Sequence, residues 1–159
     1  MISEQLIQVR EEISIAEKKS GRPKGSVKLI AVSKTFSMDN IKPLIDHGHI
    51  HFGENKVQEA VDKWTEIKNN FQNLKLHMIG KLQTNKVKNA VALFDYIHSL
   101  DSLKLAEKIS SEQNKISKKM KLFIQVNIGA ENQKSGIEVE YLKNFYEKCI
   151  NDFDLNIIG

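Results

Sequence analysis

The chain has 159 residues, of which 40% are hydrophobic and 28% are charged, and its formal net charge is +4. This length and composition can form a hydrophobic core, and the low counts of Gly (8) and Pro (2) exclude a fibrous or disordered protein. The apolar runs are far shorter than a membrane span, and the opening residues, MISEQLIQVREEI, are too polar for a signal peptide. We therefore expect a cytoplasmic globular protein without a membrane partner.

The basic residues are interspersed with acidic ones and form no single patch. Lysines alternate with acids in EAVDKWTEIK and KLAEKISSEQNKISKK, which is typical of solvated helix faces, and the only arginines are Arg10 and Arg22. No zinc-ligand spacing and no basic stripe with interleaved aromatic residues is present, so we expect neither a metal nor a nucleic-acid partner. The single cysteine, Cys149, lies on an apolar stripe and is expected in the core.

The first expected element is an N-terminal amphipathic helix, followed by the turn SGRPKGS. Its apolar face carries residues at helical spacing: Ile2, Leu6, Val9, Ile13 and Ala16. Six short segments rich in β-branched or aliphatic residues come next and predict strands. They cover residues 27–33, 49–54, 74–80, 96–102, 121–128 and 155–159.

Helical stripes separate these strands, with apolar residues at i, i+3, i+4 and i+7. The stripes are Val57, Ala60, Val61, Trp64 and Ile67; Val87, Ala90, Val91 and Phe94; and Leu142, Phe145, Tyr146 and Cys149. After the first strand, a helix is expected to start at Ser37 or Asp39 and to end at Gly48. Asp101 or Ser102 is expected to cap the helix after the fourth strand.

Strands that alternate with helices about every 25 residues indicate repeated βα units and hence a parallel sheet. An open doubly wound sheet and a (β/α)8 barrel both fit this pattern. In either architecture, chemistry is found at the carboxyl ends of the strands. Polar residues stand at those ends: Lys34, Glu54 and Asn55, Gly80 and Lys81, Ser99 and Asp101, and Asn127.

Lys34 ends the first apolar run, in LIAVSKT, where a core strand has no use for an ammonium group. One interpretation is that this lysine only points into water as the chain approaches the next helix. The other is that its amine is a nucleophile toward aldehydes, as in Schiff-base chemistry with a carbonyl substrate or with pyridoxal phosphate. The spacing alone does not separate the two.

Five motifs occur in order from about residue 27 onward: LIAVSKT, HFGENKVQEAVDKW, LHMIGKLQTNKVK, IHSLDS and LFIQVNIGAENQKSGI. Together they resemble the pyridoxal-phosphate homeostasis protein family, single-domain relatives of the barrel half of alanine racemase. The resemblance implies a TIM (β/α)8-type barrel that binds pyridoxal 5'-phosphate (PLP). It also implies that Lys34 carries the cofactor as an internal aldimine. Family members take part in vitamin B6 homeostasis without known turnover, so the resemblance implies a protein that is not an enzyme.

The resemblance also suggests further cofactor-binding residues. Asn55 of FGEN matches a position near the cofactor, although an Asn there also suits a helix cap. His77 matches a histidine of the third strand, which either faces the barrel interior or is a hydrogen-bonded core residue. Asn85, in the loop LQTNK, has a cap-and-orient role or a cofactor contact, and Ser99 is a candidate at the rim.

Family members continue past the sixth strand with two more βα units, which carry a serine-containing loop and an arginine-isoleucine-glycine motif. This chain stops at LNIIG. We therefore expect residues 1–159 to be a single PLP-binding barrel domain, C-terminally incomplete after about six strands. The family is monomeric, but open sheet edges would favour self-association of such a fragment. The alternative function is a PLP-dependent racemase-like or other Schiff-base enzyme, which would need a second domain and a tyrosine base.

Overall fold

The computed structural model describes residues 1–129, 131 and 135–159. Its main feature is one six-stranded sheet in which every strand pair is parallel, in the order β1-β2-β3-β4-β5-β8. A separate two-stranded parallel ladder joins β6 to β7. The strands are β1 (Ala31–Val32), β2 (His51–Glu54), β3 (Lys75–Met78), β4 (Tyr96–Leu100), β5 (Lys121–Ile124), β6 (Val126–Asn127), β7 (Ile137–Glu138) and β8 (Asn156–Ile157).

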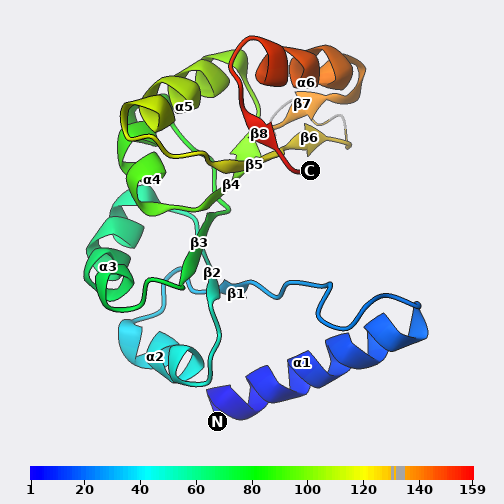
Figure 1. Ribbon diagram of the computed structural model, residues 1–159, viewed down its shortest axis with the longest axis vertical. Helices are drawn as coiled ribbons and strands as arrows, with labels where there is room; N and C mark the ends of the chain where they lie inside the picture. The colour runs from blue at the N-terminus through cyan, green and yellow to red at the C-terminus, as the bar shows by residue number, and fades with distance from the viewer. Residues whose placement is uncertain (130, 132–134) are drawn as a thin grey trace.

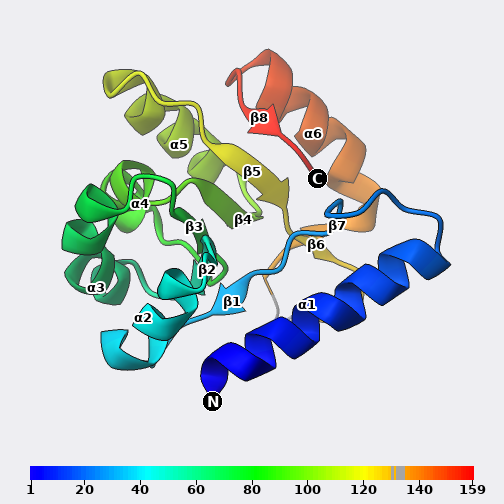
Figure 2. The ribbon, with the colours of Figure 1, turned by 60° about the horizontal axis from the view of Figure 1, so that its bottom comes forward.

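A row of helices covers one side of this sheet. The helices are α1 (Ile2–Lys19), α2 (Met38–Asp46), α3 (Val57–Asn70), α4 (Val87–Leu93), α5 (Leu103–Lys115) and α6 (Leu142–Asn151), with short 3-10 turns η1 (Thr84–Lys86) and η2 (Val139–Tyr141). Helices α2 to α6 follow the outer side of the curved sheet, whereas α1 lies apart from this row (Figure 1; Figure 2). A doubly wound sheet has helices on both faces and a reversal in strand order. The sequential order and single helix layer therefore correspond to the barrel-type arrangement.

The hydrophobic core lies between the sheet and the helix layer. Strand residues Phe52, Leu76 and Ile97 and the helix residue Trp64 are fully buried there. Cys149 is also buried, as its position on the α6 stripe predicts. The helix-facing side chains of the six-stranded sheet thus form one side of the core, which confirms the predicted βα periodicity.

Several predicted boundaries differ from the structure. The first predicted strand, 27–33, forms ladder pairs only at Ala31 and Val32. The predicted strand 121–128 divides into β5 and β6, because the backbone N–H of Gln125 still bonds to β4 while its carbonyl accepts from Ile137. The predicted helix ends are confirmed in position: Ser37 precedes α2 without a side-chain cap bond, and Gly48 follows α2 with a φ of 73°. The Ser102 hydroxyl caps α5 by accepting from the N–H of Leu105.

Helix α1 forms as predicted, but most of its apolar stripe is not covered. Leu6 is buried against α2, whereas Ile2 and Val9 are each 39% exposed. Arg10 links the helix to the end of α2 by donating to the carbonyl of His47. No helix within the described residues combines the length and the apolar character that crossing a membrane requires.

Candidate functional site

Lys34 lies at the carboxyl edge of the sheet, as its place in the sequence predicts. It is the second residue after β1, in the turn that leads to α2, and its side chain is exposed. Because β1 pairs in parallel with β2, the residues that follow β2 lie at the same edge. Lys34 and the segment beginning at Asn55 are therefore neighbours at one rim of the molecule.

The backbone on both sides of Lys34 is fixed by hydrogen bonds. The N–H of Ser33 donates to the carbonyl of Gly53 at 2.9 Å, and its hydroxyl donates to a carboxylate oxygen of Glu54 at 2.7 Å. The N–H of Thr35 donates to Oε1 of Glu59 at 2.9 Å. Thr35 has a φ of 67°, a left-handed conformation that is rare for a β-branched residue. The turn is thus held from both sides in an unusual backbone conformation.

A buried carboxylate joins this turn to helix α3. Glu54 is fully buried, and its Oε1 accepts hydrogen bonds from Lys63 Nζ at 3.1 Å and from Trp64 Nε1 at 3.0 Å, besides that of Ser33. Lys63 Nζ also donates to the Ser33 carbonyl at 3.0 Å and to Glu59 Oε1 at 3.3 Å. The hydrogen bond from the Thr35 N–H lowers the pKa of Glu59, with the Lys63 side chain as a further cause.

Sequence reasoning missed this network. Glu54 stood among the strand-end residues, but Lys63 and Trp64 drew attention only as part of a solvated face and a core stripe. The available signal was a glutamate at a strand end followed by Lys and Trp two turns into the next helix.

Asn55 follows β2 directly and is partly buried. Its Oδ1 atom is buried and has no hydrogen-bond partner among the described residues. The backbone of Asn55 lies so close to Gly80 that a Cβ at Gly80 would collide with it, which explains the glycine at the end of β3. A cavity of about 310 Å³ adjoins this point and is lined by Asn55, Lys56, Val57, Gln58, Met78, Lys81, Gln83 and Lys86.

The other two predicted rim residues lie elsewhere. Ser99 is on β4, 3% exposed, and its hydroxyl has no partner within the described part of the chain. Asn85 is exposed in η1 and lines a different cavity, of about 450 Å³, beside Lys104 and Glu107 of α5. The structure therefore groups Gln83 and Lys86 of the LQTNK loop with Asn55, and places Asn85 on the α5 side.

His77 lies on the face of the sheet opposite the helices. Strand residues alternate between the two faces, and both neighbours of His77, Leu76 and Met78, belong to the helix-covered core. Its two ring nitrogens bond to His51 Nδ1 and to His98 Nε2, each at 2.9 Å. His77 is thus a hydrogen-bonded histidine that faces away from the helix layer, and its contact with the cofactor stays a prediction.

Aromatic rings cover this histidine chain, His51–His77–His98. Tyr96 stacks on His77 with ring centroids 4.1 Å apart, and Phe123 stacks on His98 at 4.4 Å. Burial, with smaller contributions from His98 and His51, lowers the pKa of His77 to about 3. Burial also lowers the pKa of His51 and of His98. All three imidazoles are therefore neutral near pH 7, and the two bonds need one donating and one accepting nitrogen each.

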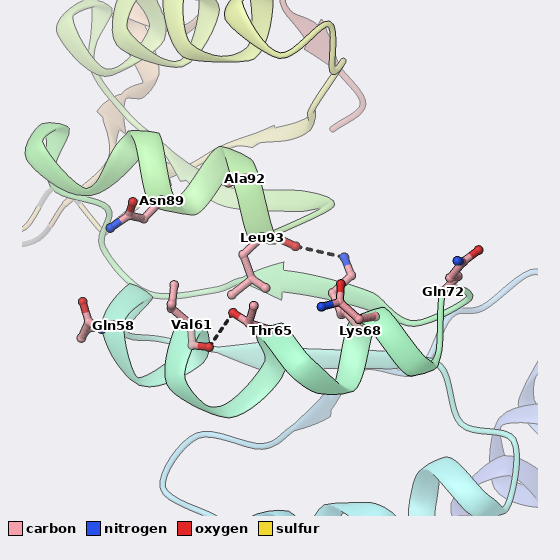
Figure 3. A pocket seen from close by; sticks show the side chains of 9 residues that line it. Gln58, Val61, Thr65, Lys68, Gln72, Asn89, Ala92 and Leu93 are labelled. Atoms are coloured by element: carbon pink, nitrogen blue, oxygen red, sulfur yellow. Dashed lines mark hydrogen bonds between the residues drawn. The ribbon is translucent and has the colours of Figure 1, made fainter.

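Figure 3 shows a cavity of about 480 Å³ between α3 and α4, on the outer helix layer. Polar side chains line much of it, including Gln58, Asn69 and Asn89. Lys68 donates there to the Leu93 carbonyl at 3.0 Å. None of the five predicted site residues lines this cavity, so it is separate from the rim.

Comparisons with known proteins agree with this architecture. The sequence model of the family described as "Alanine racemase, N-terminal domain" matches residues 5–159. The pyridoxal phosphate homeostasis protein of Escherichia coli is 39% identical over 142 residues, which cover 89% of this chain and 61% of that protein. The protein of the same name from Aquifex aeolicus is 36% identical over 156 residues, 98% of this chain and 68% of that protein.

Solved structures show the same relationship. PipY of Synechococcus elongatus with PLP bound is 34% identical, with a TM-score of 0.83 over 100% of this chain and 68% of PipY. Alanine racemase of Clostridium difficile is 14% identical with a TM-score of 0.66, a likeness of fold alone. The chain spans about three fifths of the length of the homeostasis proteins from Pasteurella multocida and Escherichia coli, 59% and 61%.

Proposed function

The chain belongs to the alanine racemase N-terminal domain family, and from that premise we propose that it binds PLP covalently through Lys34 and serves PLP homeostasis. The observation that carries the proposal is the position of Lys34: an exposed amine at the carboxyl edge of a parallel sheet, on a turn held from both sides. The proposal is supported by the relatives named pyridoxal phosphate homeostasis protein and by PipY, whose structure contains PLP.

The residues at the rim suit an aldehyde cofactor with an anionic phosphate. PLP, when bound, supplies an electrophilic aldehyde carbon. The amine of Lys34 would hold the cofactor by condensing with that carbon, with loss of one water molecule and with no oxidation or reduction. The unpartnered Asn55 Oδ1 and the lysines of the neighbouring cavity, Lys56, Lys81 and Lys86, provide polar and cationic groups at the same edge. Contacts of Asn55, His77, Asn85 and Ser99 with the cofactor remain part of the proposal.

The test is borohydride reduction of the PLP-loaded protein followed by peptide mapping. We expect the pyridoxyl group on Lys34, and we expect Lys34→Ala to lose it while the free energy of unfolding changes by less than about 0.5 kcal/mol, because the exposed side chain contributes little packing. Lys42→Ala, at an exposed lysine of α2 outside the proposed site, is the matched control and should leave capture at Lys34 unchanged. A pyridoxyl group found on Lys56, Lys81 or Lys86 in place of Lys34 would contradict the assignment.

We propose that the protein holds PLP in the cytoplasm without catalytic turnover. The carboxylates nearest to the Lys34 turn, Glu54 and Glu59, are engaged with Lys63, which leaves neither as an obvious proton acceptor at a substrate α-carbon. Incubation of the PLP-loaded protein with L-alanine in deuterated water tests this. We expect α-proton exchange at the rate of free PLP. Exchange far above that rate would favour the alternative, a racemase-like enzyme.

A further inference from the structure

We infer that Glu59 and Lys63 of helix α3 are positioning residues for the Lys34 amine. Glu59 acts on the backbone N–H of Thr35, and Lys63 acts on the backbone carbonyl of Ser33. The inference rests on the proposed function, in which Lys34 captures the cofactor, and it adds that the capture depends on a neighbouring helix.

No contact of its own side chain fixes the position of the Lys34 amine within the described part of the chain. Among the residues that the structure describes, it makes no hydrogen bond and no ion pair. The location of its amine is therefore set by the backbone of the turn. That backbone follows a two-residue strand, β1, whose ladder ends at Val32, so the sheet alone does not define it beyond Ser33.

The contacts from α3 supply the missing constraint. Glu59 Oε1 accepts from the Thr35 N–H at 2.9 Å, and Lys63 Nζ donates to the Ser33 carbonyl at 3.0 Å. These two bonds grip the residues immediately before and after Lys34. Thr35 would not adopt a φ of 67° on its own, so it persists only because the surroundings hold it.

The two positioning residues also fix each other. Lys63 Nζ lies 3.3 Å from Glu59 Oε1 and 3.1 Å from Glu54 Oε1, and Glu54 is fully buried with Trp64 as a further donor. Lys63 is itself only 12% exposed, so it has little freedom to leave. The hydrogen bonds that hold the turn are thus tied to the core through Lys63 and Glu54. Glu59 is 32% exposed, so it can be substituted without disturbing the core.

The test compares variants of Glu59 by the rate at which PLP is captured at Lys34. Capture is read by peptide mapping after borohydride reduction and is divided by capture at the exposed Lys42 of the same molecules. We expect Glu59→Ala to slow relative capture about tenfold, because small misplacements of a reacting group are costly. Glu59→Gln should stay within about twofold, since its amide oxygen still accepts from Thr35. Glu66→Ala, at an exposed carboxylate on the same helix, is the matched control and should have no effect.

A second measurement separates positioning from loss of fold. Hydrogen exchange at the Thr35 amide should be faster in Glu59→Ala and restored in Glu59→Gln. Should Glu59→Ala not fold, Glu59→Asp, which keeps the charge but shortens the side chain, replaces it and should also slow relative capture.

The outcomes are distinguishable. Wild-type capture at Lys34 with an unchanged rate in Glu59→Ala overturns the inference and leaves the proposed function intact. An equal loss of capture at Lys34 and at the reference Lys42 also overturns it. A wild-type protein that captures no PLP at Lys34 overturns the proposed function, and the inference with it.

Discussion

Two polar clusters flank β2, and they are stabilised in opposite ways. At the carboxyl edge, Glu54 and Lys63 carry full charges out of water and neutralise each other. On the helix-free face, the row His51–His77–His98 consists of one buried ring between two partly buried ones, and burial lowers the pKa of each. Removing one member of a buried charge pair leaves the other charge buried without a partner. The neutral histidines, by contrast, lose their stabilising hydrogen bonds when they are protonated. The rim should therefore respond to mutation, and the histidine chain to pH.

The largest expected effect is at the buried ion pair. Lys63→Met keeps most of the side-chain volume but leaves Glu54 buried without its cation, and we expect a loss of about 3–5 kcal/mol of unfolding free energy. The measurement is urea unfolding at pH 7. Lys42→Met, which breaks the exposed pair with Asp46 on α2, is the control and should cost less than about 1 kcal/mol. An equal loss of unfolding free energy in the two variants would show that the buried pair stabilises the fold no more than the exposed one.

The histidine chain should make stability depend on pH between about 6.5 and 3. Burial lowers the pKa of His77 in the folded protein to about 3 from its ordinary value of 6.5, so the unfolded state binds the proton first. Its contribution is fully present above pH 6.5 and is lost as the pH falls toward 3. Between pH 7 and pH 5 we expect a loss of about 2 kcal/mol from His77, with His51 and His98 adding to it in the same direction.

Unfolding curves at pH 7 and pH 5 measure this loss. Between pH 7 and pH 5 a carboxylate with a lowered pKa, such as Glu59, stays ionised in the folded protein and contributes little to this loss. His77→Gln retains a donor and an acceptor but has no proton to gain, so its unfolding free energy should change less over the same range. A pH dependence equal to that of the wild type would place the titrating group elsewhere.

The smallest expected effect concerns the strained turn. Thr35→Gly removes the Cβ that disfavours a φ of 67°, and after the entropy cost of glycine we expect a gain of no more than about 0.5 kcal/mol. Thermal unfolding measures it. Gly48→Thr, which places a threonine at a φ of 73° after α2, is the reverse control and should destabilise. A clear loss of stability in Thr35→Gly would mean that the threonine side chain itself supports the turn.

Much of the architecture could be predicted from the sequence because it depends on local periodicity. The alternation of short apolar runs with i, i+3, i+4 stripes predicted a parallel βα arrangement, and Trp64 and Cys149 are buried as their stripes require. The location of Lys34 at the carboxyl edge of the sheet could also be predicted, because Lys34 follows an apolar run and parallel strands end at a common edge. The lengths of the strands could not be predicted from the sequence, because ladder pairing at Ala31 and the break at Gln125 depend on partners distant in the chain.

By itself, then, the sequence determined the order and kind of the elements and the rim to which Lys34 belongs, because spacing along one chain decides both. Only the tertiary structure decided what surrounds that lysine. The register that sets Gly53 and Tyr96 on either side of His77 assembles three histidines from three strands. Likewise, the packing of α3 against the ends of β1 and β2 brings Glu59 and Lys63 to the turn that Lys34 occupies. Such contacts join residues about twenty to thirty positions apart, and no local pattern specifies which of them meet.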